Sequence, residues 1–243
     1  MSKEIEQLSD IIKNSNNIVF FGGAGVSTES NIPDFRSSNG LFNEKLGIHL
    51  TPEQLVSHTY YIRYTEEFYN FYKAKLIYPE AKPNAAHIAL AKLEELGKLK
   101  AIVTQNIDGL HQMAGSKNVF ELHGSVHRNY CVRCNEFYEA KFIIESEGVP
   151  TCTKCDGTVK PDVVLYEEGL DDEVIRGAIK AISNADTLII GGTSLVVYPA
   201  AGLIDYFRGK NIVLINKSAT TKDSKANLII RESIGDVLRE AIR

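Results

Sequence analysis

Four cysteines form the most specific chemical pattern in this 243-residue sequence. They make two Cys-x-x-Cys pairs separated by seventeen residues: Cys131 with Cys134, and Cys152 with Cys155. A two-residue gap lets both thiolates of a pair reach one ion, and four sulfurs close a tetrahedral shell with no open position. Disulfides and a thioredoxin-like redox pair are alternatives, but nothing at the N-terminus has the apolar core of a secretion signal. The pattern therefore predicts one structural zinc ion.

A glycine-rich stretch points to a second kind of chemistry. The apolar run Ile18–Phe21 is followed at once by three glycines: Gly22, Gly23 and Gly25. Such glycines let the backbone turn tightly and approach a ligand closely, and a helix starting after them directs free N–H groups at a phosphate. The spacing departs from Gly-x-Gly-x-x-Gly, because Thr28 occupies the third glycine position. A carboxylate, an aromatic ring and a guanidinium then occur within three residues, at Asp34, Phe35 and Arg36.

Polar or glycine-rich groups also follow four later apolar runs. They are Gln105, Asn106, Ile107 and Asp108; His123; Gly192, Thr193 and Ser194; and Asn216. In a parallel sheet, ligands bind beyond the carboxyl ends of the strands, which is where these groups would lie. His123 is the best candidate for a base, since histidine titrates near neutrality, whereas His111 is expected to be a packing or surface residue.

Purely structural roles remain open for some of these residues. Asp108 could cap a helix expected at 109–113, and Asn216 could be a simple turn residue. No serine or cysteine nucleophile stands in a recognisable elbow. The residues alone therefore predict a dinucleotide-type pocket with one histidine, an Asn/Asp pair, an arginine and no protein nucleophile.

Short apolar runs rich in β-branched residues alternate with helical stretches along most of the chain. The strands are expected at Ile18–Phe21, Leu99–Thr104, Val119–Leu122, Thr187–Ile190, Ile212–Ile215 and Leu228–Ile230. The helices between them are expected at Ala85–Leu96, Asp171–Ser183, Ala200–Phe207 and Ile234–Ile242. This alternation predicts an α/β fold with a doubly wound, parallel, Rossmann-like sheet covered on both faces.

Two stretches interrupt the alternation. Residues 39–78 form an insertion with helical spacing of aromatic side chains, and residues 125–160 hold all four cysteines. We expect them to form a smaller domain, part helical and part zinc ribbon. The dinucleotide-binding domain would then consist of residues 1–38, 79–124 and 161–243.

The composition is that of an ordinary globular protein, with 44% apolar residues and a net charge of −4, so no global basic field attracts nucleic acid or a membrane. One segment, Thr187–Ile204, carries no charge over 18 residues and reaches the length of a membrane span. Its three glycines and its proline predict a strand, a loop and a helix start instead. The expectation is a soluble cytoplasmic protein without membrane or nucleic-acid partners.

Taken together, these residues resemble the sirtuins, the NAD-dependent protein lysine deacylases, in their short bacterial or archaeal form. The stretch 23–27 with 32–37 is similar to the first signature of the family, and 104–111 is similar to the second. His123-Gly124, the paired Cys-x-x-Cys motifs, Gly192-Thr193-Ser194 and Asn216 follow in the family's order. The resemblance covers nearly the whole chain.

The resemblance implies a protein lysine deacetylase that transfers the acyl group to ADP-ribose and releases nicotinamide. It implies NAD and one structural zinc as cofactors, and acetylated-lysine proteins or peptides as substrates. His123, Asn106 and Asp108 would be catalytic, with His123 as the general base on a ribose hydroxyl. The residues around NAD would be Gly23, Ala24, Gly25, Thr28, Asp34, Phe35, Arg36, Gln105, Asn106, Ile107, Asp108, His123, Gly192, Thr193, Ser194, Asn216 and Ile234. Val164, Leu165 and Tyr166 would pair with the substrate as an added strand.

Three positions depart from the family. Tyr72 stands where family members that remove succinyl or malonyl groups carry an arginine, so neutral acyl groups are expected, and the other two positions commonly have glycine. Asn31 precedes Ile32-Pro33, and the turn there is expected to survive because asparagine tolerates positive φ. Glu167 follows Tyr166, and its carboxylate is expected to favour basic residues beside the acylated lysine.

Three other functions stay open at the level of sequence. An ADP-ribosyltransferase would share the release of nicotinamide but pass ADP-ribose to a protein. An NAD-dependent dehydrogenase needs only the glycine-rich turn and leaves Asn106 and Asp108 unexplained. A zinc-ribbon scaffold with an inactive nucleotide-binding fold would not need to keep Asn106 and Asp108 together with His123.

Overall fold

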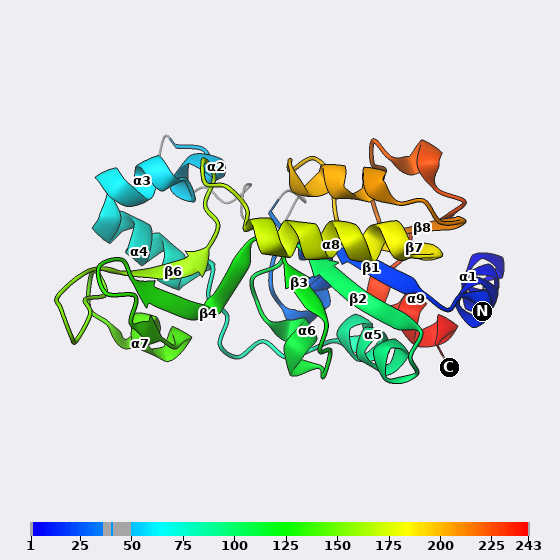
Figure 1. Ribbon diagram of the computed structural model, residues 1–243, viewed down its shortest axis with the longest axis horizontal. Helices are drawn as coiled ribbons and strands as arrows, with labels where there is room; N and C mark the ends of the chain where they lie inside the picture. Colours follow the sequence, from blue (N-terminus) through cyan, green and yellow to red (C-terminus); the bar gives the residue numbers. More distant parts are fainter. Residues whose placement is uncertain (1, 36–39, 41–49, 243) are drawn as a thin grey trace.

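A six-stranded parallel sheet forms the centre of the larger part of the molecule, on the right in Figure 1. The computed structural model describes residues 2–35, 40 and 50–242. The strand order is β3-β2-β1-β7-β8-β9, the order of a doubly wound sheet, so the predicted fold class is confirmed. All six predicted strands are present: β1 (Ile18–Gly22), β2 (Leu99–Thr104), β3 (Val119–Glu121), β7 (Thr187–Gly191), β8 (Asn211–Ile215) and β9 (Leu228–Ile230).

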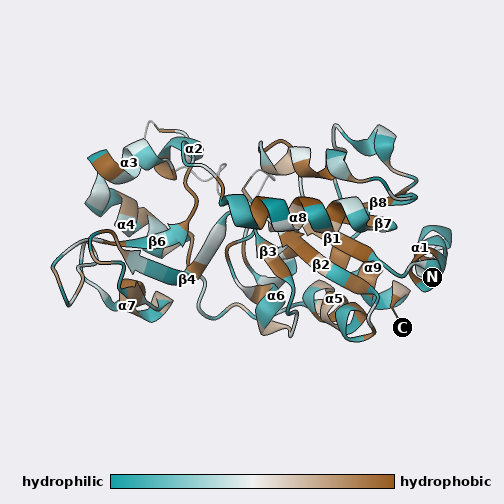
Figure 2. Ribbon diagram, in the orientation of Figure 1, coloured by the Kyte–Doolittle hydropathy of each residue, from teal (hydrophilic) through white to brown (hydrophobic). Residues whose placement is uncertain are grey.

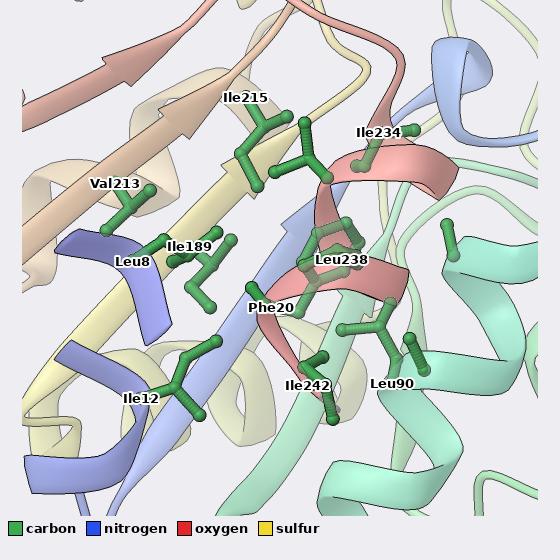
Figure 3. Close-up of a cluster of buried hydrophobic side chains, with 14 of the residues drawn as sticks. Leu8, Ile12, Phe20, Leu90, Ile189, Val213, Ile215, Ile234, Leu238 and Ile242 are labelled. Carbon is green, nitrogen blue, oxygen red and sulfur yellow. The ribbon is translucent and has the colours of Figure 1, made fainter. Parts of the chain in front are cut away.

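Helices cover both faces of this sheet, which explains why its strands are mostly apolar (Figure 2). One face packs against α1 (Lys3–Asn14), α5 (Ala85–Glu95) and α9 (Ile234–Ala241), and the other against α8 (Asp172–Asn184) and the 3-10 helix η4 (Ala200–Tyr206). Residues of β1 alternate between the two cores: Phe20 lies in the first and Phe21 in the second. Figure 3 shows the first core, where Leu8, Leu90 and Leu238 come from three different helices.

A smaller unit lies beside the sheet (Figure 1). It contains an antiparallel sheet in the order β5-β4-β6, with β4 (Gly124–Cys131), β5 (Phe137–Tyr138) and β6 (Val159–Val163), and the helix α7 (Ala140–Glu145). It also contains α2 (Pro52–Leu55), α3 (His58–Arg63) and α4 (Thr65–Lys75). One buried cluster joins Phe68, Tyr69 and Tyr72 of α4 to Val126, Cys131 and Cys152. The helices of the predicted insertion and the cysteine module therefore share a core; the domain boundaries themselves stay a prediction.

Strand β4 connects the two units, because it begins next to His123 and ends at the first cysteine. Arg128 holds this connection from both sides. Its guanidinium lies 2.6 Å from Glu121 Oε2 of β3 and 2.7 Å from Asp162 Oδ2 of β6. The position of the smaller unit relative to the parallel sheet is thus fixed close to the end of β3.

Some local features go beyond the predictions. The segment 200–207 is helical as expected, in the form of a 3-10 helix over Ala200–Tyr206. The strands β4, β5 and β6 and the helix α7 were not predicted. The uncharged segment 187–204 forms β7, a loop and the first turns of η4. Within the described residues, no helix has both the length and the apolar character that crossing a membrane requires.

Candidate functional site

The site lies where the order of the parallel sheet reverses, between β1 and β7. The turns after these two strands touch: Gly25 N–H donates to Gly192 O at 2.8 Å. A side chain could not replace Gly25, because a Cβ atom there would lie 2.8 Å from Gly192 Cα. Gly192 has a φ of +59°, which suits glycine. The two turns together form the floor of a crevice at the carboxyl ends of the strands, where such sheets bind ligands.

Two adjoining cavities, of about 820 and 620 Å³, occupy this crevice. They share lining residues, among them Gly25, Asp34, Gly192 and Asn216, so they form one continuous cleft. Every predicted site residue outside the zinc module that the structure describes lines one of them. These residues are Gly23, Ala24, Gly25, Thr28, Asp34, Phe35, Gln105, Asn106, Ile107, Asp108, His123, Val164, Leu165, Tyr166, Gly192, Thr193, Ser194, Asn216 and Ile234. Arg36 lies outside the described residues.

Ser27 joins the predicted Asn/Asp pair into one network. Its hydroxyl donates to Asp108 Oδ2 at 2.7 Å and accepts from Asn106 Nδ2 at 3.0 Å. The second oxygen of Asp108 accepts the N–H of Leu110 at 2.9 Å, so this carboxylate also caps α6 (Leu110–Met113). The amide nitrogen of Asn106 therefore donates one hydrogen inside the protein, which leaves its second hydrogen and the amide oxygen for the cleft.

His123 is held as a neutral base. Its Nδ1 lies 3.0 Å from the carbonyl oxygen of Gln105. A carbonyl only accepts, so Nδ1 carries the proton and Nε2 keeps its lone pair. Burial lowers the pKa of His123 below its usual value, and the bond to Gln105 opposes that shift. The imidazole is thus ready to accept a proton through Nε2 at neutral pH.

Gln105 and Asn216 shape the rest of the cleft. The side chain of Gln105 donates to Thr193 Oγ1 at 3.0 Å, which links the end of β2 to the end of β7 across β1. The side chain of Asn216 donates to Ser218 O at 2.8 Å and so stabilises the turn after β8. These bonds order the polar groups at three strand ends without any ligand.

The four cysteines come together as predicted. Their Sγ atoms all lie within 4.8 Å of one another, with Cys131 and Cys155 at 3.4 Å and Cys134 and Cys152 at 3.6 Å. Four thiolates bound to zinc at about 2.3 Å in a tetrahedron place their sulfurs about 3.8 Å apart. The donor set and its spacing therefore fit a structural zinc ion.

Comparison with protein families identifies the chain. The model of the Sir2 family matches residues 23–199, which include the glycine turn, the Asn/Asp network, His123 and the four cysteines. The chain belongs to the Sir2 family.

Relatives and solved structures of this family match over their full length. The chain is 79% identical to an NAD-dependent protein deacetylase of Clostridium perfringens over 243 residues, covering 100% of both chains. It is 63% identical to the protein of the same name in Clostridium acetobutylicum, with 98% of each covered. A Sir2 structure with a deacetylated p53 peptide and 3′-O-acetyl ADP ribose has a TM-score of 0.90 at 39% identity, covering 98% of this chain and 99% of the other. A Sir2 complex with a p53 peptide and NAD⁺ has a TM-score of 0.85 at 39% identity, covering 98% and 96%.

Two residues of this Sir2-family site were not singled out from the sequence. Ser27 lies in a turn between two short 3-10 helices, and only its hydrogen bonds reveal its part in the network. His127 lies on β4, and its Nε2 is 2.9 Å from the carbonyl oxygen of Asp108. Ser27 belongs to the glycine-rich signature, and this pattern could have identified it from the sequence. His127 lies several residues after strand β3, and no comparable pattern marks it.

Asn31 confirms the turn expected from the sequence. Its φ of 63° lies in the left-handed region. Asparagine adopts this conformation at low cost. The Sir2-family loop over residues 31–35 therefore starts from the same backbone geometry that a glycine would give.

Behind Asp108, this Sir2-family chain buries two histidines against each other. The rings of His87 and His111 lie 4.7 Å apart, and both side chains are almost fully shielded from water. Neither nitrogen of His111 has a hydrogen-bond partner among the described residues. Burial lowers the pKa of His87 to about 4 and that of His111 to about 3. His111 is therefore a packing residue, as the sequence predicted.

These histidines should make the fold sensitive to acid. Their pKa values are lower in the folded chain than the ~6.5 of an unfolded chain. The unfolded state therefore binds more protons, and stability is lost as the pH falls below about 6.5. Each histidine is expected to lower the free energy of unfolding by about 2 kcal/mol between pH 7 and pH 5. Urea unfolding at both pH values should show a smaller loss for His111→Phe than for the wild type; equal losses would contradict the role of His111.

Proposed function

We propose that this chain is an NAD-dependent protein lysine deacetylase, which transfers the acyl group from lysine to ADP-ribose and releases nicotinamide. The observation that carries the proposal is the cluster of His123, Asn106 and the Ser27–Asp108 pair at the switch point of the sheet. Within the described residues, no serine or threonine is hydrogen-bonded to His123, so the cleft offers a base without a protein nucleophile. The deacetylase names of the two clostridial relatives support the same reaction.

The reaction needs no protein nucleophile, because the substrate's own acyl oxygen attacks. NAD, when bound, supplies the ribose carbon that receives this oxygen as nicotinamide leaves. His123 takes a proton from a ribose hydroxyl through Nε2. Asn106 offers its amide oxygen to the reacting end of the cleft, and Asp108 contributes negative charge close by, which favours a positively charged transition state.

The remaining residues bind and exclude water. Phe35 and Ile107 both pack against the smaller unit's core and line the larger cavity, and Phe35 would shield the reacting carbon from solvent there. Gln105 holds the ribose next to His123. The adenosine half is held by Thr193, Ser194, Asn216, Thr28 and Ile234, and a phosphate contact by Arg36 is kept as a prediction from the sequence.

Acetylated-lysine peptides are the proposed substrates. They would reach His123 along the backbone of Val164, Leu165 and Tyr166, which line the larger cavity. Neither a membrane nor a nucleic acid is proposed as a partner, and the proposed location is the cytoplasm, which fractionation of cells would test.

The deciding experiment measures nicotinamide release from NAD with and without an acetyl-lysine peptide. We expect release only with the acetylated peptide, and mass spectrometry should find deacetylated peptide and O-acetyl-ADP-ribose in equal amounts. The unacetylated peptide is the control. ADP-ribose attached to protein, with the acetyl group left in place, would favour the ADP-ribosyltransferase instead.

A further inference from the structure

The segment 164–168, between β6 and α8, is hydrogen-bonded to both units of the molecule. On one side, Val164 N–H donates to the carbonyl oxygen of His123 at 3.0 Å. On the other, Tyr166 N–H donates to Val56 O at 3.0 Å, and His58 N–H donates to Tyr166 O at 2.9 Å. The segment therefore connects the backbone of the catalytic histidine with the start of α3.

Glu167, in the middle of this segment, has a backbone conformation that its side chain does not favour. Its φ is 77°, in the region where residues other than glycine are uncommon. Unlike Asn31, a glutamate gains little locally from this conformation. An energetically unfavourable φ persists when surrounding contacts hold it in place, so the side chain of Glu167 needs explanation.

The carboxylate of Glu167 is bound by Thr59. Its Oε2 accepts the backbone N–H of Thr59 at 2.8 Å and the Thr59 hydroxyl at 2.7 Å. Thr59 lies in the first turn of α3, where a backbone N–H has no acceptor within the helix. These bonds lower the pKa of Glu167, the one from the Thr59 side chain most, so the carboxylate is charged at neutral pH.

Glu168 supports the same arrangement from inside the segment. Its Oε1 lies 2.8 Å from His58 Nδ1, and its Oε2 accepts from Leu165 N–H at 2.9 Å and from Lys160 Nζ at 3.2 Å. Glu167 and Glu168 therefore both tie the segment to the first turn of α3, Glu167 through Thr59 and Glu168 through His58.

Some backbone groups of the segment are left for a substrate. Among the residues that the structure describes, the Val164 carbonyl and the N–H and carbonyl of Glu167 have no hydrogen-bond partner. An extended peptide can pair with such groups as an added strand. Their direction depends on how firmly the segment is held against α3.

We propose that Glu167 is a positioning residue for the acylated peptide: its carboxylate ties segment 164–168 to Thr59 and so orients the backbone groups that receive the substrate. The proposal rests on the proposed deacetylase function. The expectation that the Glu167 charge selects basic residues in the substrate stays a separate prediction, because Thr59 binds only Oε2 of the carboxylate.

Three variants distinguish positioning of the peptide from recognition of charged residues in it. Glu167→Gly removes the carboxylate, so the dissociation constant and the KM of an acetyl-lysine peptide should rise roughly fivefold to tenfold, with kcat changed less than about twofold. Because the same substitution relieves the unfavourable φ, the thermal midpoint should not fall. Glu167→Gln keeps an oxygen that accepts both Thr59 donors, so it should resemble the wild type. Thr59→Val removes one donor and should give an intermediate KM. Asp172→Asn, which removes an exposed acid of α8, is the matched control and should change neither constant.

The measurements use fluorescence anisotropy of a labelled acetyl-lysine peptide together with steady-state kinetics at saturating NAD. Wild-type affinity in Glu167→Gly would overturn the proposal. So would equal losses in Glu167→Gln and Glu167→Gly, or a loss confined to peptides with flanking lysine or arginine, because these results indicate charge recognition. In the double variant Thr59→Val/Glu167→Gly, the effect should equal that of Glu167→Gly alone, since both changes break one contact. Peptide binding without any turnover by the wild type would count against the deacetylase function and leave the binding comparison valid.

Discussion

Replacing His123 by alanine should lower the turnover number for deacetylation by about 10²- to 10⁴-fold, the usual contribution of a general base. The imidazole is partly buried, its Nδ1 is fixed by Gln105, and Nε2 is left to take a proton. The affinity for NAD should change little, because the ring makes no other hydrogen bond to the described residues and the glycine turns, Thr193 and Asn216 remain. Calorimetric titration with NAD and single-turnover assays with an acetyl-lysine peptide would measure both quantities.

The pH profile gives an independent readout of the same residue. A base must be neutral to act, so activity is lost as the pH falls through its pKa. Burial lowers the pKa of His123, so the acid limb of kcat/KM should lie below pH 6.5. His127→Ala is the matched control: it removes another histidine of the cleft, one that contacts the backbone of Asp108, and should keep the acid limb. Substantial deacetylation by His123→Ala, or an unchanged acid limb in that variant, would remove His123 as the base.

The parallel sheet could be predicted because its strands are short apolar runs, and the two central ones are buried on both faces. Ile18–Gly22 is apolar almost throughout, and its residues alternate between two cores, so no polar face was needed to locate it. The same holds for β7, whose five residues are all buried. The helical segment 200–207 was also predicted, but its sequence does not distinguish a 3-10 helix from an α-helix.

The small antiparallel sheet could not be predicted for a physical reason. Strand β5 has two residues, and the pairing of β4 with β6 is irregular between Gly124 and Asn129. Its strands are ordered by turns around four sulfurs and by the aromatic residues of α4, which lie far away in the sequence. Spacing revealed the cysteines but not the strands that carry them.

The polar residues of the site could be predicted from the sequence, but the hydrogen bonds between them were harder to predict. Asn106 and Asp108 follow a strand and were recognised, whereas Ser27, which joins them, comes from another strand end about eighty residues earlier. Glu167 shows the same limit more clearly. Its charge suggested a contact with substrate, and only the fold shows that Thr59 already binds it. Contacts between elements distant in sequence decide what a polar side chain is free to do.

Removal of the metal should have the largest effect on stability. Elemental analysis should find one zinc per chain, since the four Sγ atoms lie within 4.8 Å of one another. Structural zinc contributes about 10–16 kcal/mol to the folding of isolated zinc-finger peptides. Cys131 and Cys152 are buried in the same cluster as Phe68 and Tyr69, so loss of the ion removes the bonds that hold the four sulfurs together at the edge of that core.

The damage should be confined at first to the smaller unit. The two cores of the parallel sheet contain no cysteine in the described part of the chain, so the far-ultraviolet signal of α1, α5 and α8 should persist after zinc is lost. Cys152→Ser, or treatment with a strong chelator, should expose residues 125–160 to proteolysis and abolish deacetylation, because β4 leads directly from the cysteines to His123. Val132→Ser changes an exposed residue of the first Cys-x-x-Cys turn and is the matched control. The cysteines would not be a structural site if metal-free protein had four titratable thiols, normal protease resistance and normal turnover. Loss of turnover while the parallel sheet stays intact would instead show that zinc holds the catalytic histidine in place through β4.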